Sequence, residues 1–237
     1  MAKRDRRKAR GKAQVAPSHP LARPPRYEAW LDFYFGRFER DESDVWLMDW
    51  QFDASPTDLA DLFVYTMENC GRDLIAFSDR QVAAGLESLL LGNYGNVPRD
   101  IIGAGPTDAQ RVAVLRSFKR LYEDCFSSRA PPVLGHCSET QGNPLERIVY
   151  MLWDVSPFDL MARESDDRLQ ALLGVFEATL RNANEACIES ALHGLGHLGG
   201  RARKKSQSLI DDWLDGLPQV RPALLEYARQ ARSGSIL

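Results

Sequence analysis

The stretch TDAQRVAVLRSFKRLYEDCFS, residues 107–127, decides the fold of this chain. Its apolar side chains recur three and four residues apart, and its charged side chains occupy the positions between them. The apolar positions are Val114, Leu115, Phe118, Leu121, Tyr122, Cys125 and Phe126, and the charged ones include Arg116, Lys119, Arg120, Glu123 and Asp124. This period is typical of an α-helix with one buried face. The stretch therefore predicts one long amphipathic helix.

Helix signals recur on both sides of this stretch. Ser55 followed by Pro56 provides an N-cap and a first helical residue, and Ser78 with Gln81 forms a capping-box pattern. Other predicted helices cover an aromatic stripe at about 30–38, a segment from Asn143-Pro144 to about 156, and about 165–181, 183–198, 203–215 and 219–231. Residues 45–52 could form an extended piece, a short helix or an ordered aromatic crossing. We expect an all-α, multi-helix domain of antiparallel helix pairs over residues 26–237.

Composition narrows the class of protein. The chain has 237 residues, 44% of them hydrophobic, and a net charge of −3, as in ordinary globular proteins. No run approaches the roughly 18–20 apolar residues that a membrane helix needs, and no secretory leader is apparent. The four cysteines form no CxxC pair, so we expect reduced thiols rather than a zinc ribbon or a disulfide scaffold. We therefore expect a cytoplasmic protein without membrane contact.

The N-terminus differs from the rest of the chain. Residues 1–12 carry a charge of +6, which leaves −9 for the remaining residues, and four prolines follow between residues 14 and 25. We expect residues 1–25 to form a disordered, basic and Pro-rich tail. Its basic side chains are Lys3, Arg4, Arg6, Arg7, Lys8, Arg10 and Lys12. Two interpretations remain: an arm that binds nucleic acid through phosphate contacts, or a solvated leader.

Residues 182–216 contain NANEACIESALHGLGHL, a short basic connector, and SQSLIDDWLDG. This segment resembles one HEAT-type repeat of the phycobilisome-lyase-like kind, in which two helices pack as a pair. The resemblance covers about 35 residues, and it departs from the family pattern at His193, at His197 and in the longer connector 201–205. It implies stacked antiparallel helix pairs over the C-terminal third, about 165–237, that present a binding surface to another protein.

His193 and His197 stand four residues apart on the predicted helix 183–198. Zinc hydrolases present two imidazoles from one helix face at this spacing. Glu189 continues the same stripe but lies roughly 12 Å of axial rise from His197, too far to share one ion with it easily. The nearest candidates for a third ligand by residue type are His136 and Cys137 in the loop 128–142. The pattern therefore permits a zinc or other divalent metal site.

The same histidines have a plainer interpretation. Gly194 and Gly196 are costly inside a helix, so another backbone or a ligand should approach closely there. Close helix packing would then leave the imidazole nitrogens hydrogen-bonded across the interface. A polar groove for a partner protein, formed by Glu189, His193 and His197, is the remaining possibility.

Motifs for other chemistry are absent from the sequence. There is no GxxxxGK[ST], no GxSxG and no HExxH, which removes P-loop, α/β-hydrolase and zincin chemistry. The leading hypothesis is a non-enzymatic, cofactor-free helical module that binds another protein, as an adaptor or an immunity-like protein. The alternatives are a metal-dependent enzyme using His193 and His197 and a protein that associates with nucleic acid through its tail.

Overall fold

Most of the helices predicted from the sequence are present in the described part of the chain. The computed structural model describes residues 21–36, 51–91, 96–216 and 219–236, and these residues contain helices and loops but no strand. The all-α prediction is confirmed. The basic tail 1–12 and most of the ambiguous segment 45–52 lie outside the described residues, and the remaining Gln51 and Phe52 belong to no helix or strand.

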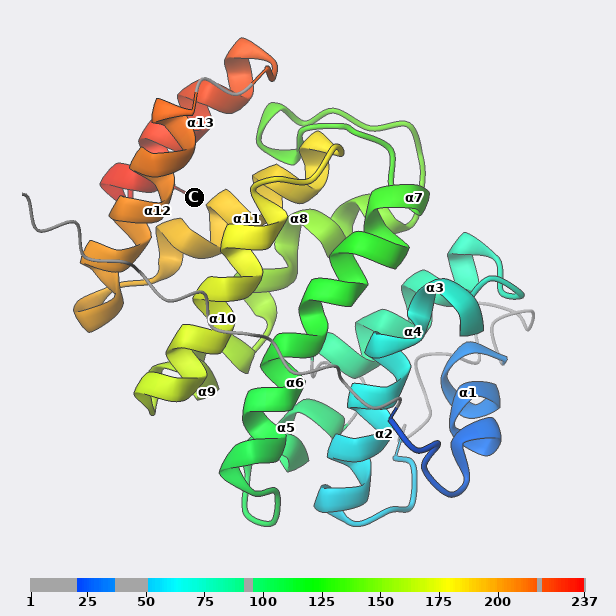
Figure 1. Cartoon of the computed structure of the whole chain (residues 1–237). Helices are drawn as coiled ribbons and strands as arrows, with labels where there is room; N and C mark the ends of the chain where they lie inside the picture. The colour runs from blue at the N-terminus through cyan, green and yellow to red at the C-terminus, as the bar shows by residue number, and fades with distance from the viewer. Residues whose placement is uncertain (1–20, 37–50, 92–95, 217–218, 237) are drawn as a thin grey trace, which may run out of the picture.

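The helical elements are named as in Figure 1. They are α1 (Tyr27–Phe35), α2 (Pro56–Glu68), α3 (Cys70–Asp73), α4 (Asp79–Leu90), α5 (Val97–Ile102), α6 (Asp108–Arg120), α7 (Ser127–Arg129), α8 (Leu145–Val155), α9 (Phe158–Arg163), α10 (Asp166–Thr179), α11 (Glu185–His197), α12 (Arg203–Asp215) and α13 (Pro222–Ser233). A π-helical segment covers Leu121–Phe126, and 3₁₀ turns cover Gly135–Cys137 and Gly200–Ala202. The short helices α5 and α9 were not among the helices predicted from the sequence.

The predicted caps are confirmed. The Ser55 hydroxyl accepts a hydrogen bond from the Asp58 N–H at the start of α2, and Ser78 and Gln81 form both bonds of a capping box at the start of α4. A second capping box, between Thr107 and Gln110, begins α6. These caps fix the first turns of three helices that form the N-terminal half of the core.

The predicted single helix over 107–127 is wrong in its last third. The α-helix ends at Arg120, and the chain continues as a π-helix through Phe126. In this wide segment the Tyr122 hydroxyl meets the Ser190 hydroxyl at 2.7 Å and accepts a hydrogen bond from Trp153 Nε1 at 2.8 Å. These bonds join the π segment to α8 and α11, and they compensate for the poorer geometry of a π turn.

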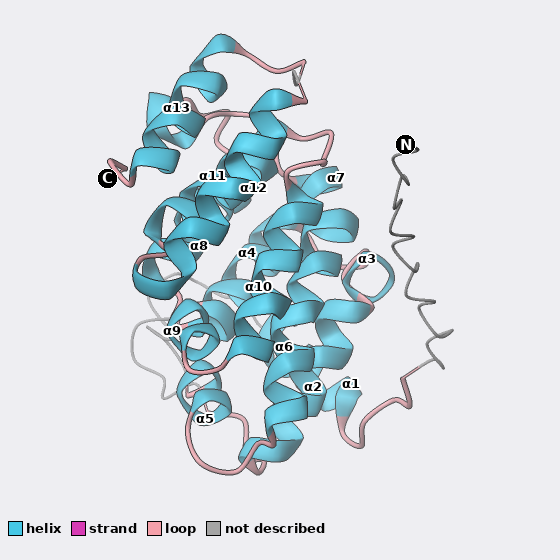
Figure 2. Ribbon diagram, turned by 60° about the vertical axis from the view of Figure 1, so that its left-hand side comes forward, coloured by secondary structure: helices cyan, strands magenta, loops and turns pink. Residues whose placement is uncertain are grey.

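Helix α6 lies in the middle of the molecule, between α2 and α10 (Figure 1). Helix α11 packs most extensively on α8 and α13 and also contacts α10 and α12 (Figure 2). The apolar core runs without interruption from α1 to α13. The HEAT-type pairing of α11 with α12 remains a prediction, because α12 packs against α13 as well as against α11.

The expected close approach of another backbone is confirmed at Gly196, whereas Gly194 is approached by aromatic side chains. A Cβ on Gly194 would lie 2.5 Å from the Phe176 ring and 2.9 Å from the Trp153 ring. A Cβ on Gly196 would meet the Ile236 side chain and lie 3.2 Å from the Ala231 Cα. The absence of side chains at these two positions lets α11 sit in the centre of the C-terminal half.

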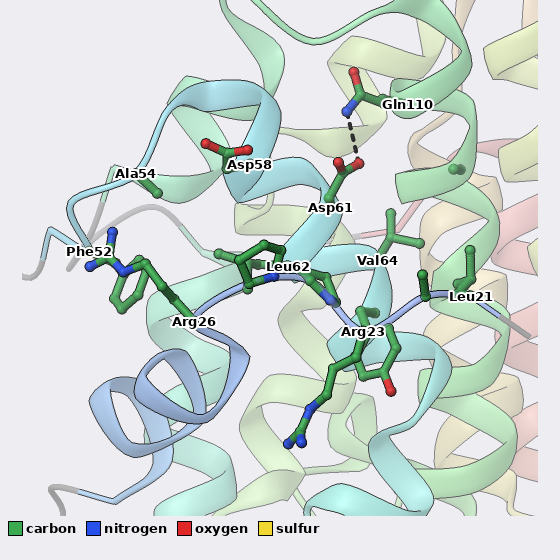
Figure 3. Close-up of a pocket in the computed structure, with 15 residues that line it drawn as sticks. Leu21, Arg23, Arg26, Phe52, Ala54, Asp58, Asp61, Leu62, Val64 and Gln110 are labelled. Carbon is green, nitrogen blue, oxygen red and sulfur yellow. Dashed lines mark hydrogen bonds between the residues drawn. The ribbon is translucent and has the colours of Figure 1, made fainter.

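Residues 21–26 lie across α2 without helical structure and close a cavity of about 580 Å³ against α2 and α6 (Figure 3). Apolar side chains such as Leu62 and Val64 line it, and at its edge Asp61 accepts a hydrogen bond from Gln110 at 2.8 Å. The Arg26 guanidinium stacks over the Phe52 ring at 4.7 Å and donates to the Asp53 carbonyl. These contacts anchor the chain before α1.

None of the described helices combines the length and apolar character that crossing a membrane requires.

Candidate metal centre

Helix α11 brings its two histidines together at its C-terminal end. Asn184 caps the start of the helix through the Ala186 N–H, and its side-chain amide donates to the carbonyls of Ser127 and Ala130. From this anchored start, the four-residue spacing places both imidazoles on one face. The Nε2 atoms of His193 and His197 are 3.0 Å apart.

A third ligand group comes from α8. Asp154 Oδ1 lies 3.5 Å from His197 Nε2, and one potential ligand atom from each of Asp154, His193 and His197 falls within 4.8 Å of the other two. His136 and Cys137, the candidates for a third ligand by residue type, are not in this group, in which the third side chain is that of Asp154. Among the described residues, this is the group of three such side chains that could hold a metal ion.

The cluster is closed on one side and open on the other. The His193 side chain is fully buried, whereas those of His197 and Asp154 are 32% and 35% exposed. An ion held here would be covered by protein on the His193 side and reached by solvent on the Asp154 side. Solvent can therefore approach the cluster beside Asp154.

A tyrosine fixes the orientation of the buried histidine. His193 Nδ1 is 2.6 Å from the Tyr227 hydroxyl on α13, and Tyr227 in turn is hydrogen-bonded to Tyr150 on α8. The Tyr150 ring also contacts the His193 ring edge-on. If the Nδ1–H donates to Tyr227, the His193 Nε2 lone pair faces His197 and Asp154. Metal-ligating histidines are usually oriented in this way by a partner on their second nitrogen.

The protonation state of His193 also suits a ligand. Burial, and after it the neighbouring His197, lower the pKa of His193 to about 4, and the carboxylate of Asp154 opposes this effect. The ring is therefore neutral near pH 7. A neutral imidazole has a free lone pair, which is the form that binds metal ions.

Glu189, which the sequence placed on the same stripe, serves another part of the molecule. Its buried carboxylate accepts hydrogen bonds from the backbone N–H groups of Gly135 at 2.8 Å and His136 at 3.0 Å. The same carboxylate lies 2.5 Å from His136 Nδ1. Glu189 therefore holds the loop before α8 against α11, and it is not part of the group around Asp154.

The burial of these residues limits the predicted protein-binding groove. Of Glu189, His193 and His197, only His197 has an appreciable exposed surface. A partner protein that docks on this face would therefore reach His197 together with Asp154.

Comparison of the chain with models of protein families, with curated proteins and with solved structures finds no match. The geometry and the chemistry of this site therefore remain as the guide to function.

Proposed function

We propose that the protein is a metal-dependent enzyme that binds one divalent transition-metal ion, of the zinc class, through Asp154, His193 and His197. The mutual distances of the three ligand atoms carry this proposal. Two nitrogens bound to one zinc ion lie about 3.3 Å apart when the Zn–N bonds are about 2.05 Å long and the angle is tetrahedral. The observed separation of 3.0 Å between the Nε2 atoms needs only a small opening to reach this value.

The donor set also fits the ion chemically. Two imidazoles and one carboxylate are the ligands of several catalytic zinc sites and of non-haem iron sites. Three protein ligands leave a position for water, and a zinc ion lowers the pKa of such a water to about 7. The chain then supplies orientation through Tyr227 and an opening toward solvent beside Asp154. Hydrolysis of an ester, amide or phosphoester is the reaction class that this arrangement serves.

Residues of α9 support the exposed side of the centre. Arg163 donates to the His197 carbonyl at 3.2 Å and to the Asp159 carboxylate at 2.5 Å. The guanidinium therefore fastens the last turn of α11, where His197 lies, to α9. With a metal ion bound, His197 would be held in place both by α11 and by the hydrogen bonds of Arg163.

Metal binding is tested by titration of chelator-treated, untagged protein with Zn²⁺, Mn²⁺, Co²⁺ and Ni²⁺, followed by calorimetry and elemental analysis. We expect one ion per chain for the wild type and loss of binding in Asp154→Asn and in His193→Ala/His197→Ala. The control is Asp73→Asn, because Asp73 is a partly exposed carboxylate that lies outside the metal group and has its own tyrosine and arginine partners. Wild-type protein that binds none of the four ions would refute the proposal.

The catalytic part is tested separately, with p-nitrophenyl esters, p-nitroanilides and p-nitrophenyl phosphates as probes. We expect metal-dependent turnover of at least one class, lost in Asp154→Asn and retained in Asp73→Asn. Stoichiometric metal without turnover of any class would refute hydrolysis and leave a metal-binding protein. The protein-binding module and the nucleic-acid association of the tail remain predictions.

A further inference from the structure

A second group of reactive side chains lies in the loop before α8, on the 3₁₀ turn Gly135–Cys137. The exposed Cys137 has its Sγ 3.3 Å from Nε2 of the adjacent His136. His136 Nδ1 lies 2.5 Å from the buried carboxylate of Glu189. The order is thus thiol, imidazole and carboxylate, which is the order of nucleophile, base and orienting group in thiol enzymes.

The carboxylate decides which nitrogen of His136 carries the proton. An ionised carboxylate only accepts hydrogen bonds, so Nδ1 must be the donor to Glu189. This leaves the lone pair of Nε2 facing the Cys137 thiol. The His136 ring is further held flat against the Tyr227 ring, with centroids 4.3 Å apart.

The loop itself is fixed in place. Arg221, just before α13, donates to both carboxylate oxygens of Glu139 and to the Pro132 carbonyl. The Glu139 carboxylate in turn accepts from the Leu134 N–H. The thiol and its base are therefore presented by a preorganised turn and not by a loose loop.

The Cys137 thiol needs His136 as a base to become a thiolate. Desolvation and the carboxylates of Glu139 and Glu189 raise the pKa of the Cys137 thiol, while Arg221 opposes them. The resting state is thus the neutral thiol, with His136 positioned to accept its proton.

The backbone of the turn narrows the reaction class. Acyl transfer needs free N–H groups to stabilise an oxyanion. Here the N–H groups of Gly135 and His136 donate to Glu189, those of Cys137 and Glu139 to the Leu134 carbonyl, and that of Ser138 to the Gly135 carbonyl. No N–H of residues 135–139 remains for an oxyanion. Attack on a sulfur atom needs no such donor.

We propose that Cys137 is a base-assisted thiol that exchanges with low-molecular-weight disulfides and becomes reversibly S-thiolated. His136 Nε2 takes the thiol proton, and the Cys137 sulfur attacks one sulfur of R–S–S–R. The new Cys137–S–S–R bond forms as the old S–S bond breaks, and the departing thiolate takes the proton from His136 to give R–SH. Cys137 is oxidised and the departing sulfur is reduced.

The reaction stops at the mixed disulfide. The three other cysteines of the chain, Cys70, Cys125 and Cys187, are buried in the core and cannot reach Cys137 to resolve it. A second external thiol is therefore needed to release the modification. This inference is independent of the metal centre, because none of Cys137, His136 and Glu189 belongs to the Asp154 group.

The test uses glutathione disulfide as the probe, with chelator present and intact-mass and peptide-mapping mass spectrometry as the readout. A free cysteine is only a few per cent thiolate at pH 7, so base assistance should raise the rate about tenfold. We expect the folded wild type to gain one glutathione, at Cys137, about tenfold faster than Cys137 of the same chain unfolded in urea. His136→Asn and Glu189→Gln should lose this advantage, and Cys137→Ser should remain unmodified.

Two results would overturn the proposal. One is a folded-state rate at Cys137 equal to or below the rate in urea, a comparison that needs no variant to fold. The other is an undiminished rate in His136→Asn whose circular dichroism spectrum matches the wild type. Release of the glutathione by dithiothreitol, with recovery of the original mass, completes the expected result.

Discussion

The hydrogen bond between Tyr227 and His193 offers the sharpest test of the metal centre, through the substitution Tyr227→Phe. The tyrosine is 3% exposed, its oxygen is 2.6 Å from His193 Nδ1, and the phenylalanine ring would still stack on His136. The change therefore removes one oxygen and leaves a buried imidazole nitrogen without its partner. Such a group costs about 1–3 kcal/mol, and loss of an orienting partner typically weakens metal affinity about 10–100-fold.

The assay measures two quantities in the same variant, the free energy of unfolding in urea and the zinc affinity by competition with a chromogenic chelator. The matched control is Tyr122→Phe, because Tyr122 is also a buried phenol whose oxygen has two hydrogen-bond partners, on other residues. We expect both variants to lose stability and only Tyr227→Phe to lose metal affinity. Equal zinc affinity in Tyr227→Phe and wild type would refute the orienting role, and equal losses in both variants would show that the effect is only one of stability.

Three further predictions concern stability. Gly194→Ala should lower the free energy of unfolding by about 1–3 kcal/mol, because its Cβ would meet two aromatic rings. Gly174→Ala, whose Cβ meets nothing within 4 Å, should instead raise the free energy of unfolding by up to about 1 kcal/mol. Urea titrations in which both variants change the free energy of unfolding in the same direction would contradict this prediction. Ser78→Ala should cost about 1 kcal/mol through loss of the capping box with Gln81, and an unchanged urea midpoint would contradict it. Addition of EDTA to zinc-loaded protein should lower its Tm, since an ion that binds only the folded state stabilises it, and should leave the Tm of Asp154→Asn unchanged; a shift in Asp154→Asn would place the ion elsewhere.

Much of the fold could be predicted because the deciding signals are local. A serine cap, as at Ser55 and Ser78, favours the start of a helix through a hydrogen bond to a backbone N–H three residues later, so its signal lies within a few residues of sequence. The π segment at 121–126 escaped prediction for the converse reason. Its buried pairs, Leu121 with Cys125 and Tyr122 with Phe126, have the four-residue spacing of any α-helix. Only the distant hydrogen-bond partners of Tyr122 therefore distinguish the π-helix from an α-helix.

In the candidate site, too, residues with a local sequence signal could be predicted and residues defined by distant contacts could not. The pair His193 and His197 could be predicted, because two residues four apart on a helix share a face by geometry alone. Asp154 could not, since it follows Trp153 in an amphipathic helix and reads as one more exposed carboxylate. Only the packing of α8 on α11 gives it a role. The partners of Glu189 could not be predicted either, because no sequence signal relates their loop to α11.

The three histidines in the described residues show why residue type alone could not assign their chemistry. His136 and His193 both contact Tyr227, yet the Nδ1 of His136 meets a carboxylate and that of His193 meets a phenol. The Glu189 carboxylate turns Nε2 of His136 toward Cys137, whereas Tyr227 turns Nε2 of His193, a ring that burial and His197 keep neutral, toward Asp154. The partner on the second nitrogen, supplied each time by a different helix, therefore separates a proton acceptor at Cys137 from a ligand beside Asp154.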